Sequence, residues 1–420
     1  MVDPLLDLDD LRDILIEEGH ISHIAPRIEK EGVLRLEVQG KVVVPGLIDM
    51  HCHLRDFKEA HKETIATGAR AAALGGFTTV VCEPNTVPPM DNAETLQQWI
   101  NRAKKESCVN LYTKVCITKG RHGEQLTRLK ALVRKPWVVA ATDDGNPVVR
   151  DQVMKRAFAM AREHELLLTP HCEESPATIQ AFQTENPLIP LPDEIARYQR
   201  EPHYVARDLM LAEEANWRLH ICHVSMAASL ELIRKARARW VPVTCEATPH
   251  HLTLTQKEAR RCGSDAKVNP PLRAREDVKA LRQGLRDGTI DVIASDHAPH
   301  TPEEKAQGWE EAPMGVIGLE TTLGVILTAV VHPGIITLSA AIERMSSNPA
   351  RILGIPGGSL EKGRPADITI IDLDKKWVVD PEVFASKGRN TPFRGWRLMG
   401  KAYATIVKGE VVMKEGELLI

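Results

Sequence analysis

The chain has 420 residues, of which 43% are hydrophobic and 26% are charged, and its formal net charge is -3. This composition is typical of a globular protein and excludes a largely disordered one. The small net charge argues against a nucleic-acid or membrane surface, and no apolar run approaches the roughly 20 residues that cross a bilayer. The length suits one barrel-sized domain of roughly 250–300 residues with a smaller domain beside it.

The cysteines and the first residues indicate the compartment. Residues 1–10 are acidic and lack the basic-then-apolar order of a secretory signal. The chain has eight scattered cysteines, and Cys52, Cys172 and Cys222 stand next to histidines in predicted strands. This pattern favours a reduced, cytoplasmic protein over one held together by disulfides.

Short apolar segments rich in β-branched residues alternate with longer segments of helical periodicity. Strands are predicted at 42–50, 78–82, 111–117, 138–141, 166–169, 219–222, 241–245 and 290–294. Helices are predicted at 62–74, 93–105, 151–164, 203–216, 226–239 and 276–286. Eight strands with helices between most of them indicate an α/β fold, a TIM-like (β/α)8 barrel with parallel strands. A doubly wound open sheet is less favoured, because no Gly-rich phosphate loop follows any of these strands.

The two ends of the chain differ from its middle. Short strands are predicted there at 14–16, 34–38, 367–372, 404–407 and 410–412. We expect residues 1–44 and 357–420 to form one small composite β-domain beside a barrel of residues 45–356. The connection 173–202 contains several prolines and little periodicity, and we interpret it as an active-site loop.

His51 and His53 stand at the end of the first predicted barrel strand. Residues two apart on a strand point to the same face, so both imidazoles aim at one point. Such a pair is half of a divalent-metal site. A His-X-His pair taken alone is more often two solvated histidines than a metal site. The residues at the other strand ends decide between these two interpretations.

Polar residues follow most of the other predicted strands. They are Glu83, Asn85, Asp143, Asp144, His171, His223, His250, His251, Asp296, His297 and His300. In a parallel barrel these strand ends converge on one face, where active sites of the fold lie. Each residue alone has a plain structural explanation, as an aspartate before glycine is usually a turn residue. Their joint occurrence predicts a coordination set of four histidines and two aspartates, which suits zinc. We interpret His250 and His251 as structural or supporting residues.

Such a set serves hydrolysis. Two divalent metals about 3.5–4 Å apart can activate one water and polarise a carbonyl. Asp144 suits a carboxylate that bridges the metals, although alternation along the strand does not decide between Asp143 and Asp144. Asp296 suits a carboxylate that accepts a proton and passes it to a leaving nitrogen. Arg55 continues the same-face alternation from His53, and its guanidinium can grip a substrate carboxylate with two hydrogen bonds.

The order of HxH, acid, His, His and Asp along a barrel resembles the amidohydrolase superfamily. Within it, the surrounding segments resemble the bacterial type I dihydroorotases. The matching segments are 45–55, 83–86, 142–145, 171–174, 223–225, 246–252, 267–273, 295–301, 312–315, 318–321, 348–350, 366–368 and 386–391. One departure is Arg55-Asp56-Phe57-Lys58, where the family usually reads Arg-Glu-Pro-Gly.

The resemblance implies roles for individual residues. The implied ligands of one or two zinc ions are His51, His53, Asp144, His171, His223 and Asp296. Asp296 is also the implied catalytic acid and base, and the family motif places the bridging carboxylate at Asp144. The implied substrate-binding groups are Arg55, Asn85 and His300 for a carboxylate, with Asn269 and the backbone of Met314 and Gly315 for the ring.

The implied reaction is the reversible closure of N-carbamoyl-L-aspartate to dihydroorotate, a step of pyrimidine biosynthesis. The resemblance also implies a homodimer and a complex with aspartate transcarbamoylase, without nucleic acid or membrane partners. Two alternatives stay open. One is a hydantoinase or allantoinase acting on related cyclic amides, against which Arg55 and Asn85 argue. The other is a catalytically silent homologue that serves as a scaffold for aspartate transcarbamoylase; such proteins lose ligands, and this chain keeps them.

Overall fold

The structure is a computed structural model that describes residues 1–133, 135–173 and 200–419. Its centre is a sheet of eight parallel strands that lie side by side in chain order. They are β6 (Leu47–Cys52), β7 (Phe77–Cys82), β8 (Asn110–Val115), β9 (Val138–Ala141), β10 (Leu167–Leu168), β11 (Leu219–Ile221), β12 (Val243–Ala247) and β13 (Val292–Ile293). The predicted α/β barrel is confirmed, because each strand lies within a few residues of its predicted apolar segment.

Contacts between the first and last strands close this sheet into a barrel. Cys52, the last residue of β6, pairs in a parallel bridge with His297, which lies beyond the end of β13. The N–H of His53 donates to the carbonyl of His297 at 2.8 Å. On the inside, Asp49 accepts a hydrogen bond from the N–H of Ser295 at 3.0 Å. The two ends that carry His53 and Asp296 are therefore held next to each other.

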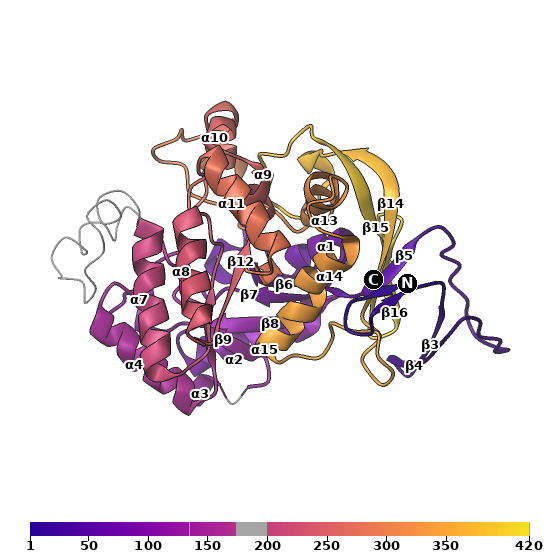
Figure 1. The fold of residues 1–420 in the computed structure, drawn as a ribbon, viewed down its shortest axis with the longest axis horizontal. Helices are drawn as coiled ribbons and strands as arrows, with labels where there is room; N and C mark the ends of the chain where they lie inside the picture. Colours follow the sequence, from indigo (N-terminus) through magenta and orange to yellow (C-terminus); the bar gives the residue numbers. More distant parts are fainter. Residues whose placement is uncertain (134, 174–199, 420) are drawn as a thin grey trace.

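Helices surround the barrel (Figure 1), and six of the main ones lie where the apolar periodicity predicts them, whereas the helix at residues 348–353 was not predicted. The main ones are α1 (Ile65–Gly75), α2 (Ala93–Glu106), α4 (Asp151–Glu163), α7 (Arg200–Ala215), α8 (Ala227–Ala238), α11 (Arg275–Arg286) and α15 (Asn348–Leu353). Along one flank, α4, α7, α8 and α11 pack in succession. In the part of the chain that is described, no helix is both long and apolar enough to cross a membrane.

A second, smaller sheet joins segments from the two ends of the chain. Its strands, in spatial order, are β17 (Glu417–Leu418), β16 (Glu410–Lys414), β15 (Arg397–Val407), β14 (Ile368–Val378) and β5 (Val42–Pro45). A hairpin of β3 (Asp13–Glu17) and β4 (His20–Ala25) lies beside it, and Figure 1 shows both chain ends at this side of the molecule. The predicted composite β-domain is present.

Two predictions about the first 50 residues were wrong in detail. The segment 34–38 forms no strand, and Leu34 is 98% exposed. A strand needs a neighbour that takes its backbone hydrogen bonds, and an apolar pattern does not provide one. The predicted single strand 42–50 is divided at Gly46, since β5 pairs with β14 of the small sheet and β6 begins the barrel.

Gly46 allows this transfer between sheets, because the backbone there passes directly against β7. A Cβ atom on Gly46 would lie 2.1 Å from Oγ1 and 2.6 Å from Cγ2 of Thr78. The backbone N–H of Gly46 donates to the carbonyl of Asp367 at 2.9 Å, which fixes the junction. The predicted active-site loop 173–202 falls mostly on residues 174–199, which lie outside the described part of the chain.

We expect Gly46→Ala to destabilise the protein by about 1–3 kcal/mol, the usual effect of overpacking a tight interior. Urea unfolding followed by circular dichroism measures this loss. Adding Thr78→Ala removes the two closest atoms and should restore part of the stability. An unchanged unfolding midpoint for Gly46→Ala would show that the junction can shift without loss.

Candidate active site and metal centre

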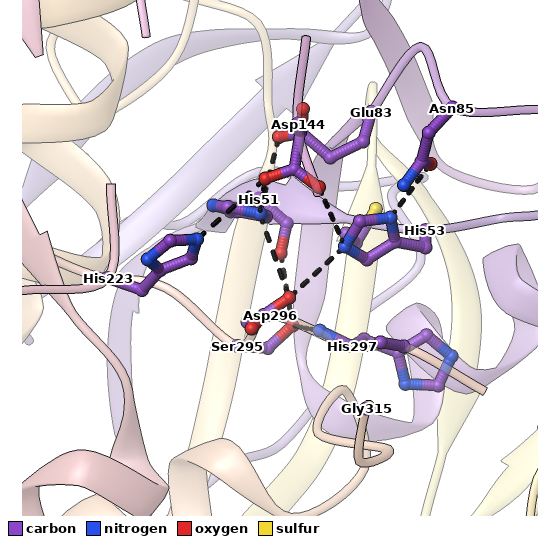
Figure 2. A network of polar contacts seen from close by, with 12 residues as sticks. His51, His53, Glu83, Asn85, Asp144, His223, Ser295, Asp296, His297 and Gly315 are labelled. Carbon is purple, nitrogen blue, oxygen red and sulfur yellow. Dashed lines mark hydrogen bonds and ion pairs between the residues drawn. The ribbon is translucent and has the colours of Figure 1, made fainter. Parts of the chain in front are cut away.

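The barrel brings the six predicted metal-ligating residues together at the carboxyl ends of its strands. His51 lies at the end of β6, with His53 just beyond it, and Asp144, His171, His223 and Asp296 follow β9, β10, β11 and β13. All six side chains are buried. Figure 2 shows His51, His53, Asp144, His223 and Asp296 pointing toward one another.

Asp144 occupies the middle of this group. Its Oδ1 lies 3.3 Å from His51 Nε2 and 3.5 Å from His171 Nδ1. The same oxygen lies 3.8 Å from His223 Nε2, whereas Oδ2 lies 3.5 Å from His53 Nε2. One carboxylate therefore presents its two oxygens to two sets of imidazoles, as a bridging ligand must.

Asp143 points elsewhere. It accepts hydrogen bonds from the backbone N–H of Thr118 at 3.0 Å and from the hydroxyl of the same residue. Of the two adjacent aspartates that alternation left open, Asp144 is the one that faces the histidines. Asp143 instead ties the end of β9 to the loop after β8.

His53 and Asp296 form the other side of the group. His53 Nδ1 donates to Asn85 Oδ1 at 2.9 Å, so its Nε2 is turned toward Asp296 Oδ1 at 3.1 Å. Burial acts to raise the pKa of Asp296, but the hydrogen bond from His53 outweighs it and holds that pKa far below its usual range. Asp296 is therefore an ionised carboxylate that can receive a proton.

Two of these residues hold a strained backbone. His223 has a φ of 31° and Asp296 a φ of 46°, in the left-handed region that side chains with a Cβ seldom occupy. Residues in such conformations persist only where the surrounding structure enforces them, and they cluster at functional sites. The strain turns both side chains inward directly after their strands end.

The group has the geometry of a cation site. His51, Asp144 and His223 have ligand atoms within 4.8 Å of one another, and so do His51, His53 and Asp296. Among the described residues, His51 Nε2 and Asp144 Oδ1 are buried without a hydrogen-bond partner. Buried polar atoms that lack a partner are costly, and a metal ion supplies the missing one. The residues therefore fit a bound metal ion.

The electrostatics lead to the same conclusion. Burial alone would lower the pKa of His51, but the carboxylates of Glu83 and Glu246 raise it well above its usual value. Burial would raise the pKa of Asp144, but His51 holds it well below its usual range. A surplus of buried negative charge at this point favours any cation, whether a proton or a divalent metal.

Sequence reasoning missed the residue that orients His51. Glu246 in β12 is fully buried, and its Oε1 accepts from His51 Nδ1 at 2.6 Å while Oε2 lies 3.2 Å from His220 Nε2. Such a contact fixes the tautomer of a metal-binding histidine and leaves Nε2 for the metal. A glutamate inside an otherwise apolar strand was the available signal.

A second missed feature is a buried ion pair below the site. Lys114 in β8 and Glu83 at the end of β7 are both completely buried and form an ion pair. Burial acts to raise the pKa of Glu83 and to lower that of Lys114, and each charge offsets this effect on the other. Glu83 also lies 3.6 Å from His51 Nε2. A lysine within the apolar strand 111–117 was the sequence signal.

Four of the predicted substrate-binding residues lie together: Arg55, His300, Met314 and Gly315. Arg55 is 8% exposed, and its Nη2 lies 3.1 Å from His300 Nε2. His300 Nε2 in turn lies 2.9 Å from the carbonyl oxygen of Met314. Burial and then the charge of Arg55 lower the pKa of His300 to about 2, so the imidazole is neutral. Gly315 follows with a φ of 140°, and a Cβ there would lie 2.7 Å from the carbonyl oxygen of Ala298.

The amide nitrogen of Asn269 lies 3.0 Å from His171 Nε2. It is thus placed against a predicted metal ligand. His250 and His251 lie on α9 (Pro249–Thr253) and are buried. Burial lowers the pKa of both, that of His250 to about 4, and His251 Nε2 donates to the carbonyl of Pro270 at 2.9 Å. The contact of His251 agrees with our interpretation of it as structural or supporting, whereas His250 Nε2 has no hydrogen-bond partner among the described residues.

The segment Asp56-Phe57-Lys58, which departs from the usual family pattern, still holds Arg55 in the site. Arg55, Asp56 and Phe57 have φ values of 52°, 60° and 47°. The buried Asp56 caps this turn by accepting from the N–H of Phe57 at 2.8 Å, and it pairs with Arg102 Nη2 at 3.1 Å. This ion pair to α2 holds a turn that has neither glycine nor proline.

Comparisons with known proteins fit this geometry. A model of the amidohydrolase family matches residues 42–412. A dihydroorotase of Pelotomaculum thermopropionicum is 46% identical over 418 residues, which is 99% of this chain and 97% of the relative. A dihydroorotase of Acetivibrio thermocellus is 43% identical over 425 residues, covering 100% of this chain and 98% of that protein.

Among solved structures, the L-hydantoinase (dihydropyrimidinase) of Arthrobacter aurescens has a TM-score of 0.86 at 28% identity, and the match covers 100% of this chain and 95% of that one. The dihydropyrimidinase of Brevibacillus agri has a TM-score of 0.84 at 21% identity over 97% and 92% of the two chains, which shows a shared fold. Most of the chain matches the family model, and near-complete relatives are more than 40% identical. The chain therefore belongs to the amidohydrolase family.

Proposed function

We propose that the protein is a zinc-dependent dihydroorotase, which closes N-carbamoyl-L-aspartate to dihydroorotate and reopens it. The observation that carries the proposal is Arg55, a buried guanidinium beside the metal-binding group. A buried cation at that place suits a ring that carries a carboxylate. The relatives that are more than 40% identical along nearly the whole chain are dihydroorotases.

The proposed ligands of one or two zinc ions are His51, His53, Asp144, His171, His223 and Asp296. Imidazole and carboxylate ligands suit zinc. Bound zinc would supply an activated water and polarise the carbonyl under attack. Asp144, with its two oxygens facing different histidines, would hold two ions close together.

The remaining steps belong to the protein's own side chains. In ring opening, Asp296 takes the proton of the attacking water and delivers it to the departing amide nitrogen, and in closure it runs the reverse transfer. His53 donates through Nδ1 to Asn85 and would bind zinc through Nε2, and the nearby cation would then keep Asp296 ionised until that proton arrives. Asp296 Oδ1 and Asp144 Oδ2 lie 3.1 Å and 3.5 Å from the same atom, His53 Nε2, so the proposed proton carrier stands beside the proposed bridging carboxylate.

The substrate-binding groups then fix the ring. Arg55, Asn85 and His300 would bind the carboxylate, and Asn269 with the backbone of Met314 and Gly315 would hold the ring amide groups. Arg55 reaches its position through the turn that Asp56 caps. A carboxylate bound there would be desolvated, so removing the Arg55 guanidinium would strongly weaken substrate binding.

The two alternatives differ from this proposal in testable ways. A hydantoinase has the same fold, but its ring carries no carboxylate for Arg55. A silent scaffold would not need six converging metal-binding side chains. Homodimerisation, a complex with aspartate transcarbamoylase and a cytoplasmic location stay predictions from the resemblance.

The decisive assay follows dihydroorotate opening by the purified protein through its ultraviolet absorbance, with zinc and after chelation. We expect turnover with zinc and its loss after chelation. Hydantoin and allantoin serve as comparison substrates. Turnover of hydantoin without turnover of dihydroorotate would overturn the proposal in favour of a hydantoinase, and no turnover of any of them would favour the scaffold.

Asp296→Asn should lower kcat in both directions by about 10²–10⁴-fold, the typical contribution of a general acid and base. Asparagine keeps the shape of the side chain but cannot accept the proton. The zinc content and the melting temperature of the variant show whether the fold and the metal are retained. Near-normal kcat in a zinc-loaded variant would refute the proton-transfer role.

Zinc should stabilise the protein, because the cation binds the folded state alone. A free zinc concentration 100 times Kd should add about 2.7 kcal/mol. His51→Ala should abolish this gain, since His51 belongs to each of the candidate metal groups. His332→Ala, at an exposed histidine, is the matched control and should bind zinc like the parent protein. Atomic absorption and thermal unfolding measure both effects, and equal zinc content in all three proteins would show that the metal binds elsewhere.

A further inference from the structure

A second arginine lies at the mouth of the site. Arg121 ends the short 3-10 turn η2 (Lys119–Arg121), in the loop that follows β8. Its Nη2 lies 3.3 Å from the point where a Cβ on Gly145 would sit, and the amide nitrogen of Asn85 lies 3.9 Å from the same point. Gly145 directly follows Asp144. Two donors on different strand ends therefore face one space beside the metal-binding group, and glycine keeps that space open.

The guanidinium of Arg121 is only partly paired. Its Nη2 donates to the side-chain oxygen of Asn146 at 3.2 Å, in the amide orientation that satisfies both ends of that asparagine. Its Nε is buried and has no hydrogen-bond partner among the residues the structure describes. A guanidinium has five N–H groups, and burying one without an acceptor is unfavourable. The side chain thus keeps donors for an anion.

The loop holds Arg121 firmly in this place. Its φ of 59° lies in the left-handed region, as do those of the site residues Arg55 and Asp296. The N–H of Gly120 donates to Asp91 at 2.8 Å, and the N–H of Arg121 donates to the carbonyl of Thr118 at 3.1 Å. A long flexible side chain on a fixed, strained turn loses less entropy on binding than one on a mobile loop.

We propose that Arg121 is a specificity-determining residue that contacts the substrate carboxylate together with Arg55 and Asn85. This inference rests on the proposed function, because it assumes a ring that carries a carboxylate. The two oxygens of a carboxylate accept about four hydrogen bonds, so they leave room for one from Arg121 beside those proposed for Arg55, Asn85 and His300. Arg121 would thereby separate dihydroorotate and N-carbamoyl-L-aspartate from uncharged cyclic amides.

The test compares Arg121→Met with Arg128→Met, which removes an exposed arginine from the same connection. For dihydroorotate opening, Arg121→Met should raise KM by about tenfold or more, as expected for a lost hydrogen bond to a charged group. Its kcat should change by less than about threefold, because Arg121 does not touch the reacting amide. Arg128→Met should keep both constants. Arg121→Lys, which retains the charge but not the planar fork, should give an intermediate KM.

A second measurement uses dihydrouracil, the same ring without the carboxylate. Arg121→Met should open dihydrouracil no more slowly than the parent protein does. The preference for dihydroorotate over dihydrouracil, measured as the ratio of the two kcat/KM values, should fall in both Arg55→Met and Arg121→Met. An unchanged KM for dihydroorotate, or an equal loss on both rings with a lower melting temperature, would overturn the inference and make Arg121 structural. If Arg121→Met does not fold, Arg121→Gln replaces it, and the same result is expected: a raised KM for dihydroorotate with a nearly unchanged kcat. If the parent protein fails to open dihydroorotate, the proposed function fails, whatever the variants do.

Discussion

The carboxylate of Asp144 is the constraint around which the site is built. It is buried among four imidazoles from three strand ends, and its two oxygens face different members of that group. An ionised carboxylate in such surroundings is stable only if cations or protonated histidines surround it. The deeper groups repeat this arrangement, since Glu246 holds His51 and Glu83 pairs with Lys114. The barrel interior is therefore a layered set of charges that a metal ion would complete.

The barrel and the residues gathered at its candidate site could be predicted from the sequence, because of one property of parallel barrels. Strand ends of a parallel barrel share one face, so residues such as His51 and His171, far apart in the chain, could be assigned to one site before any coordinates. Alternation also placed Arg55 on the side of His53. These inferences need only strand direction and the period of two.

Other features depended on contacts that spacing does not record. The choice of Asp144 over Asp143 follows from the hydrogen bonds of Thr118, a residue on another strand's loop. The division of one apolar run at Gly46 follows from the proximity of Thr78. Segment 34–38 has a strand-like pattern, but no strand in the described part of the chain pairs with it. Lys114 and Glu246 look like isolated charges in apolar strands until their partners are seen.

The pairing of β5 with β14 has a consequence for the newly made chain. The N–H of Leu47 bonds to Thr369 Oγ1, a residue 322 positions later, and β5 pairs with β14 in the same region. During synthesis, the strand that leads into the barrel must therefore wait for almost the whole chain before it finds its partner. Domains usually fold from the N-terminus as they leave the ribosome, at about 5–20 residues per second. This molecule instead has an open strand edge for most of its translation, a period in which chaperones would be most useful and aggregation most probable.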